Sequence, residues 1–330
     1  MSYLNKSLHI TSTIFSAFIS ILFGLMIISF PLGAYAVFNS SIGDDIDFSF
    51  PLDRFDIFVA GLNLGIPLEY EVGDVFIVFW SIFAILFVIA FLGPRRHFLK
   101  TINNLLNKGA TNSDSNYLVN VIKWFSVLVV ASGIINFIQE WFGISTLPPE
   151  STNDLILFLT ITISPITEEL GFRVMLIGIP LFLIFAHKSS IKFFFISLWH
   201  PYNSLHIMQH RKAIGLIIIV GIFFGIAHII SGEPWSNGKF AQAALSGIII
   251  GWVYYRYGLI SAILVHWATN YFIYSYIFFV SDLNQISIQN AIFHSMIGVF
   301  ELILVTAGTI SLIMILLNYF YVKNQKELSV

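Results

Sequence analysis

The chain has 330 residues, of which 57% are hydrophobic and only 10% are charged, and its formal net charge is −2. A soluble globular protein of average composition carries about 25% charged residues. So few charges cannot give a folded chain of this length a water-facing surface, and a net charge near zero offers no footprint for nucleic-acid phosphates. The lack of cysteine excludes disulfides, a thiolate nucleophile and a cysteine metal site. The composition therefore indicates an integral membrane protein embedded in a lipid bilayer, which does not bind nucleic acid.

Hydrophobic runs long enough to cross a bilayer follow one another along the chain. A helix that crosses about 30 Å of hydrocarbon needs about 20 mostly apolar residues. Roughly eight runs qualify, near residues 11–37, 75–93, 118–138, 154–186, 214–231, 240–256, 260–280 and 296–321. They predict an all-α, polytopic transmembrane helix bundle of about eight spans. Because proline removes an amide donor and disfavours helix before it, Pro165 predicts a break in the fourth run, with a second helix starting there.

The positions of the basic residues predict an orientation. If the number of spans is even, only Arg54 and Lys239 of the 16 Lys and Arg residues fall on the side opposite to the termini, and Arg173 lies within a span. Cytoplasmic loops of membrane proteins are enriched in Lys and Arg. The asymmetry therefore predicts a multi-pass protein of the cell membrane with both termini in the cytoplasm. The first outer loop is rich in acidic residues, which indicates a solvated cover: Asp44, Asp45, Asp47, Asp53, Asp56, Glu69, Glu71 and Asp74.

Three regions follow from this pattern. Residues 1–150 hold the first spans and the acidic loop, residues 151–280 form a core, and residues 281–330 form a last span with a cytoplasmic tail. Within the core, residues 187–213 are rich in aromatic residues, Lys and His, which favours a helix lying in the membrane interface. Glycines four residues apart in the fifth and sixth runs let helix backbones approach closely and predict that these two spans lie in the interior of the bundle: Gly221, Gly225, Gly247 and Gly251.

The fourth run contains three charged side chains that are expensive to place in lipid. An ionisable group at the bilayer centre costs at least about 2.5–3.5 kcal/mol on insertion scales. On a helix, Glu169 and Arg173 are four residues apart and can pair, whereas Glu168 points about 100° away from Glu169. A carboxylate without its own cation is a candidate general base. The alternative is that both acids share Arg173 as structural glue.

Three more polar residues lie in later spans. His228 follows an apolar stretch and in isolation indicates a hydrogen-bonded histidine between helices. His266 and Asn270 are four residues apart and therefore share one helix face. Together with a carboxylate, two imidazoles and an amide can activate a water and stabilise an oxyanion. The same side chains can instead hold a divalent metal such as zinc, with Glu168, His228 and His266 as its ligands.

The order of these residues resembles a known family. EELGFR at 168–173 matches EExxxR, Phe224 to His228 matches FxxxH, and His266 to Asn270 matches HxxxN. In this order the motifs resemble the CPBP family, which comprises type II CAAX prenyl proteases and bacteriocin-processing or immunity proteins. The resemblance covers roughly residues 154–275. The HExxH, GxGD and GxSG signatures of other intramembrane proteases are missing from the sequence or lack their partners.

The resemblance implies an intramembrane endopeptidase that acts on a membrane-bound protein or a lipidated peptide. In that family pattern, Glu168 and His228 would activate the attacking water. His266 and Asn270 would stabilise the oxyanion, and the pair formed by Glu169 and Arg173 would organise the site. The family has been described both as metalloproteases and as metal-independent glutamate proteases, so a metal stays open.

Two departures from the family pattern concern the second motif and its surroundings. Val174 stands where the family has glycine, and the distance from Glu168 to His228 is 60 residues (168 to 228), because residues 187–213 are inserted. His200 lies within that insertion and competes with His228 for the same role. His228 is favoured because a phenylalanine precedes it by four residues. His206 and His210 give the insertion a His-rich character, which we interpret as an interfacial surface rather than a metal site.

Two interpretations from other classes remain. A non-proteolytic immunity or scaffold membrane protein would keep the motifs for packing, so that its stability rather than any turnover would depend on them. A proton-coupled transporter using Glu168 and Glu169 would show two related halves with broken helices in corresponding positions. The sequence predicts only the break at Pro165, which disfavours a transporter.

Overall fold

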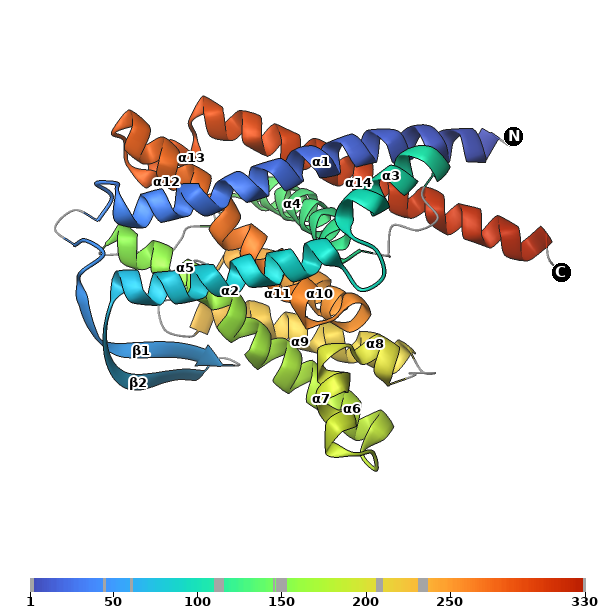
Figure 1. Cartoon of the computed structure of the whole chain (residues 1–330), viewed down its shortest axis with the longest axis horizontal. Helices are drawn as coiled ribbons and strands as arrows, with labels where there is room; N and C mark the ends of the chain where they lie inside the picture. The colour runs from blue at the N-terminus through green and yellow to red at the C-terminus, as the bar shows by residue number, and fades with distance from the viewer. Residues whose placement is uncertain are drawn as a thin grey trace.

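The computed structural model describes residues 3–43, 46–59, 62–109, 116–144, 146, 153–205, 210–230 and 237–328. These residues form an elongated all-α bundle with a two-stranded hairpin at one end (Figure 1). Asp44, Asp45 and His206, which the sequence analysis singled out, lie outside the described residues.

Seven helical segments of the described chain are long and apolar enough to cross a membrane. Five of them are single helices: α1 (Tyr3–Phe38), α2 (Val72–Leu92), α4 (Tyr117–Trp141), α9 (His210–Ile230) and α14 (Ser295–Leu328). The other two contain a π-helical stretch: α5 (Asp154–Glu168), η2 (Glu169–Gly178) and α6 (Ile179–Ala186), and then α11 (Leu259–Trp267), η3 (Ala268–Phe272) and α12 (Ile273–Asn284). The prediction of an integral, multi-pass, all-α protein is confirmed.

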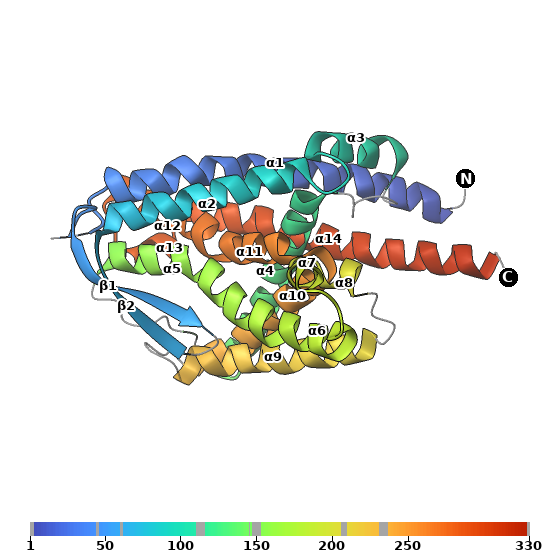
Figure 2. The same cartoon turned by 60° about the horizontal axis from the view of Figure 1, so that its bottom comes forward.

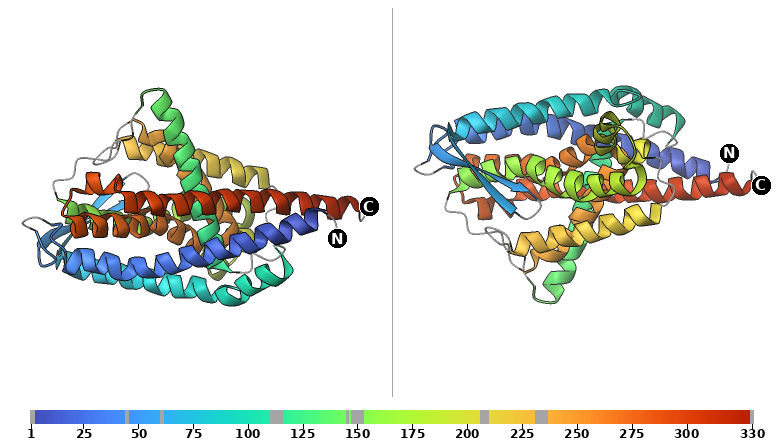
Figure 3. Two further views of the ribbon diagram at one scale, coloured as in Figure 1. Left: turned by 90° about the horizontal axis from the view of Figure 1, so that it is seen from above. Right: turned by 90° about the horizontal axis from the view of Figure 1, so that it is seen from below.

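The sixth of the eight predicted spans, 240–256, also forms a helix, α10 (Lys239–Tyr257). It is not among the seven, because polar residues at its ends and along its length lower its hydropathy. α1 begins and α14 ends at the same end of the bundle (Figure 1), which is the arrangement that an even number of crossings gives. α4, drawn in green in Figure 3, runs across the long axis of α1 and α14.

The remaining helices are short. The sequence predicts a helix in the insertion 187–213, and α7 (Ile191–Trp199) and α8 (Pro201–Ser204) lie there, followed by the start of α9. α3 (Phe98–Lys108) and α13 (Ile288–Ile292) connect longer helices and were not predicted. α3 alternates apolar and polar residues on opposite faces and is too short to span lipid, so the search for apolar runs passes over it.

The acidic outer loop contains a hairpin that the sequence analysis did not predict. β1 (Pro51–Val59) and β2 (Leu62–Glu71) pair antiparallel, with an irregular register between Leu52 and Arg54. β2 exposes Leu62, Leu64 and Ile66, which share one face because alternate residues of a strand do. Figure 2 shows the strands running from the end of the bundle where α5 begins towards α9, and β1 packs against α5 and η2.

The predicted break at Pro165 is wrong. α5 continues through Pro165 to Glu168, and the irregular stretch is η2, which begins at Glu169. Proline cannot donate to the carbonyl four residues before it, here that of Ile161. The side chain of Asn270 donates to that carbonyl instead, with an Nδ2–O distance of 3.3 Å. A neighbouring helix thus supplies the missing donor, which is how prolines are tolerated inside membrane helices.

Two contacts hold the site-bearing helices in place. α9 and α10 approach closely at their glycines, since a Cβ atom built on Gly247 would lie 2.9 Å from the Cα atom of Gly221. On the other side, the Tyr271 hydroxyl donates to the carbonyl oxygen of Phe30 over 3.0 Å and ties η3 to α1. The polar core is therefore clamped between close-packed helices.

Candidate active site

The predicted site residues come from three helical segments that meet in the middle of the bundle. Glu168 ends α5, Glu169 and Arg173 lie in η2, His228 lies in α9, and His266 and Asn270 lie at the junction of α11 and η3. Both segments that carry the acids and the HxxxN motif switch to π-helix at these residues. π-Helical turns are rare and occur frequently at functional sites. They widen the turn and so change the directions in which successive side chains point.

Glu169 and Arg173 form a fully buried ion pair. Their exposed fractions are 0% and 1%, and the Arg173 Nε atom lies 3.0 Å from Glu169 Oε2. The other carboxylate oxygen, Oε1, lies 2.8 Å from His266 Nδ1. Because an ionised carboxylate only accepts hydrogen bonds, Nδ1–H is the donor. The predicted pairing of Glu169 and Arg173 therefore exists, and it also orients the imidazole ring of His266. We call Glu169 and Arg173 the ionic frame.

Glu168 is in a different situation, although it is the neighbouring residue. Its side chain is 12% exposed, and its Oε2 atom lies 3.9 Å from His266 Nε2, which is too far for a direct hydrogen bond. This oxygen has no hydrogen-bond partner among the residues that the structure describes. An unsatisfied buried carboxylate oxygen in a folded protein calls for a catalytic role or a bound water. Glu168 is thus the unpaired carboxylate that the sequence predicts.

His228 approaches the same centre from α9. Its Nδ1 atom lies 2.9 Å from the carbonyl oxygen of Phe224, which makes Nδ1–H the donor and leaves Nε2 as the acceptor in the neutral ring. The charge of Glu168 acts on the His228 imidazole, which places the two groups within electrostatic range of each other. The structure therefore places Glu168 within electrostatic range of His228 and 3.9 Å from His266 Nε2.

Phe224 has a role that the motif alone does not reveal. Its ring centroid lies 4.5 Å from the Arg173 guanidinium, 4.5 Å from the His228 ring and 6.1 Å from the His266 ring. A guanidinium near an aromatic face gains a cation–π attraction that is stronger when desolvated. Phe224 therefore packs against Arg173 of the ionic frame and against both imidazole rings. The FxxxH spacing places this ring and His228 on one face of α9.

Asn270 contacts the helix of the acids rather than the acids themselves. Its Nδ2 atom donates to Ser164 Oγ over 2.8 Å and to the Ile161 carbonyl oxygen over 3.3 Å, and its Oδ1 atom accepts from the Thr269 hydroxyl. Ser164 was not among the predicted site residues. The Ser-Pro pair was the available signal, because a proline leaves a carbonyl that some other donor has to satisfy.

His200 and His210 of the insertion lie outside this centre. His200 stacks on Tyr117 of α4, with its Nε2 atom 2.8 Å from the tyrosine hydroxyl, and Gly258 packs against its ring. His210 pairs with the hydroxyl of Tyr255 over 2.9 Å. His200 is therefore placed as a packing residue between α4 and α7. Val174 lies within η2, which continues through it.

Lys239 is a charged neighbour that the sequence analysis assigned to the outer side of the membrane without a role. It opens α10, and the charge of Glu168 acts on its ammonium group. The backbone beside it is fixed, because Gln139 Nε2 donates to the Gly238 carbonyl over 2.7 Å. Glu168 therefore lies in a field set by two cations, Lys239 and Arg173. The tight packing of α10 on α9 is what brings Lys239 near the site.

The predicted metal ligands do not form a metal site in this arrangement. Among the described residues, no three His, Asp or Glu side chains are grouped so that they could hold a metal ion. The Nδ1 bonds of His228 and His266 leave both Nε2 atoms able to ligate, so it is the grouping of the side chains, and not their tautomers, that does not make a metal site. The chemistry below is therefore derived from the side chains alone.

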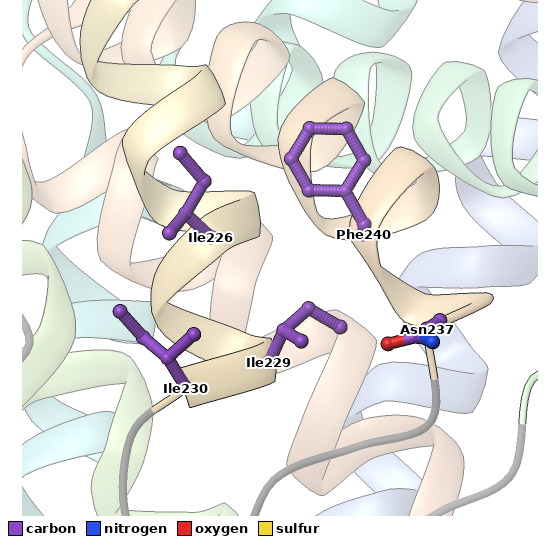
Figure 4. A pocket seen from close by; sticks show the side chains of 5 residues that line it. All are labelled: Ile226, Ile229, Ile230, Asn237 and Phe240. Atoms are coloured by element: carbon purple, nitrogen blue, oxygen red, sulfur yellow. The ribbon is translucent and has the colours of Figure 1, made fainter.

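An apolar hollow of about 340 Å³ lies one turn beyond His228. Figure 4 shows Ile226, Ile229 and Ile230 of α9 facing Phe240 of α10, with Asn237 at one edge. The connection between the two helices, residues 231–236, lies outside the described residues. An apolar recess next to a polar centre suits a ligand that carries a hydrophobic group.

Comparison with known protein families agrees with this site. Residues 151–272 match the family described as type II CAAX prenyl endopeptidase Rce1-like. The matched range includes every predicted site residue: Glu168, Glu169, Arg173, His228, His266 and Asn270. Comparisons with curated proteins and with solved structures found no match. Residues 151–272 thus form an Rce1-like domain of the CPBP family of intramembrane endopeptidases.

Proposed function

We propose that this protein hydrolyses a peptide bond of a membrane-bound protein or lipidated peptide, with Glu168 as the general base. The observation that carries the proposal is the contrast between two adjacent carboxylates. Glu169 lies 2.8 Å from His266 Nδ1 and 3.0 Å from Arg173 Nε, whereas Glu168 Oε2 lies 3.9 Å from His266 Nε2. A carboxylate with spare acceptor capacity can take a proton from water.

The first step is the activation of a water by Glu168. The 3.9 Å between Glu168 Oε2 and His266 Nε2 is a separation that one water can bridge. Glu168 removes a proton from this water as its oxygen attacks the carbonyl carbon of the scissile peptide bond. The Nδ1–H group of His228 donates to the Phe224 carbonyl. Its Nε2 atom accepts a hydrogen bond from the second O–H of the water and so holds the water in place, without taking that proton. The metal-free route needs no further group at this point.

The second step is stabilisation of the negative oxygen that this attack creates. Glu169 holds His266 at Nδ1, so that Nε2, when it carries a proton, is directed at the oxyanion. The Asn270 amide supplies the second donor. Glu168 then passes the proton it took to the leaving amine nitrogen, the C–N bond breaks, and the carboxylate is regenerated. Atoms and charges balance with water as the only co-reactant.

The substrate class rests on the family and on the surroundings of the site. The apolar hollow beside His228 suits a hydrophobic or lipid-modified segment. We place both termini in the cytoplasm, because the basic residues gather on their side. A cysteine-free chain allows this orientation to be tested with single introduced cysteines, Lys6→Cys at one end and Asp53→Cys in the hairpin, labelled in intact and permeabilised cells.

The proposal is tested with purified protein in proteoliposomes and a fluorogenic peptide, supplied in prenylated and unlipidated forms. Glu168→Ala is expected to lower cleavage at least about 1,000-fold, a loss within the range attributed to general acid–base catalysis. Glu301→Ala is the matched control, because it removes another intramembrane glutamate, on the exposed side of α14. Full cleavage by folded Glu168→Ala protein would overturn the proposal.

The metal-free route has its own test. Prolonged dialysis against a strong zinc chelator is expected to leave the cleavage rate within about twofold of the untreated protein, because no step above uses a metal. Magnesium-saturated chelator serves as the control for nonspecific effects. Loss of cleavage that zinc alone restores would replace water activation by Glu168 with activation by a metal.

A further inference from the structure

The hydrogen bonds around Asn270 raise a question for any catalytic use of this amide. An amide nitrogen has two N–H donors, and both have acceptors here, the Ser164 hydroxyl at 2.8 Å and the Ile161 carbonyl at 3.3 Å. In this state Asn270 has no donor left for a substrate. A donor therefore has to be released before Asn270 can contact an oxyanion.

Releasing either bond has a cost that depends on what replaces it. The Ile161 carbonyl has already lost its helical donor to Pro165, and a buried carbonyl left unsatisfied costs about 1–3 kcal/mol. Ser164 limits this cost, because its hydroxyl already donates to the same carbonyl over 3.4 Å. The serine hydroxyl therefore contacts both the amide of Asn270 and the Ile161 carbonyl to which that amide donates.

We propose that Ser164 is a positioning residue that takes over the Ile161 carbonyl when Asn270 turns an N–H to the oxyanion. The hydroxyl keeps donating to the Ile161 carbonyl while Asn270 withdraws its own N–H, so the carbonyl that lost its helical donor to Pro165 stays satisfied while the amide is freed. The Thr269 hydroxyl, which lies 2.7 Å from the His266 carbonyl oxygen and 3.3 Å from Asn270 Oδ1, stays beside the amide oxygen during this change. This inference rests on the proposed function and assigns a role to a residue outside the family's three motifs.

The test measures cleavage kinetics of the whole chain in proteoliposomes, with the same fluorogenic peptide. Ser164→Ala is expected to lower kcat about tenfold and leave KM within twofold, because Asn270 would have to leave the carbonyl unsatisfied in the transition state only. Ser164→Thr keeps the hydroxyl and is expected to restore most of kcat. Thr160→Ala is the matched control, since its hydroxyl also donates to a carbonyl of α5, that of Ile156, which is not an acceptor of Asn270.

A double variant separates exchange from simple packing. In an Asn270→Ala background, which no longer has the amide, Ser164→Ala is expected to cause no further loss of kcat. Full kcat in Ser164→Ala, or losses that multiply in the double variant, would overturn the inference. Either result leaves the proposed function standing as long as Glu168→Ala stays inactive, whereas cleavage by Glu168→Ala would remove the proposed function itself.

Discussion

Two adjacent glutamates of one helix have opposite surroundings in this protein. Glu169 is fully buried, 2.8 Å from His266 Nδ1 and 3.0 Å from Arg173 Nε, whereas the Glu168 side chain is 12% exposed and its Oε2 atom lies 3.9 Å from His266 Nε2. The switch from α5 to η2 falls between them. Two identical residues that are adjacent in the sequence can therefore have different roles: Glu169 holds the site together, and Glu168 remains available for reaction.

The same contrast explains why both acids are tolerated in a membrane helix. The ionic frame offsets the cost of burying Glu169, because a charge in lipid is accepted when it is paired and hydrogen-bonded. Glu168 instead sits beside two imidazoles and within range of Lys239. Breaking the two arrangements is therefore expected to have different consequences.

Breaking the ionic frame is expected to have the largest effect on stability. Arg173→Ala leaves the buried Glu169 without its cation, and removal of one partner of a buried pair typically costs about 3–5 kcal/mol. Thermal unfolding in a fixed detergent measures the loss. Lys192→Ala, which removes an exposed cation of α7, is the control and should leave the midpoint unchanged. An unchanged midpoint in Arg173→Ala would show that the pair does not hold the site together.

Removing His228 is expected to affect turnover rather than stability. His228→Ala deletes the group that holds the water, and general acid–base or water-positioning groups are worth about 100- to 10,000-fold in rate. We expect kcat to fall at least about 100-fold with a nearly unchanged unfolding midpoint, measured with the fluorogenic peptide. If His200→Ala rather than His228→Ala abolishes cleavage, the assignment of the second motif is wrong.

The smallest effect is expected for His200, which packs against Tyr117 outside the site. His200→Asn loses one hydrogen bond, worth about 0.5–1.5 kcal/mol of stability, and should leave kcat unchanged. Burial lowers the pKa of His200, so below its ordinary pKa of about 6.5 the unfolded chain binds the proton more readily and stability falls with falling pH. Unfolding midpoints measured between pH 5 and 8 should show a shallower acid decline in the variant. A steeper decline would contradict this placement.

The spans and the site residues were predictable because each leaves a strong local signal. Runs of about 20 apolar residues define the helices, and charges stranded inside such runs mark Glu168, Glu169 and Arg173. The approach of α9 to α10 follows from glycines four residues apart. Each of these signals depends only on residues that are close together in the chain, so it can be read from the sequence alone.

Other features depend on contacts between distant segments and were missed for that reason. Pro165 predicts a broken helix in isolation, but Asn270, more than 100 residues later (165 to 270), repairs the bond that proline lacks. The proximity of Lys239 to Glu168 depends on the packing of α10 against α9. The hairpin between α1 and α2 forms in a segment whose acidic residues suggested only solvation.

The most direct test of the division between the two acids places Glu168→Gln and Glu169→Gln side by side. Each variant exchanges a carboxylate for an amide of the same shape, and both the unfolding midpoint in detergent and the cleavage rate in proteoliposomes are measured. The account predicts that Glu168→Gln unfolds like the unchanged protein but does not cleave, whereas Glu169→Gln unfolds at a clearly lower temperature. A stable, inactive Glu169→Gln together with an active Glu168→Gln would contradict it.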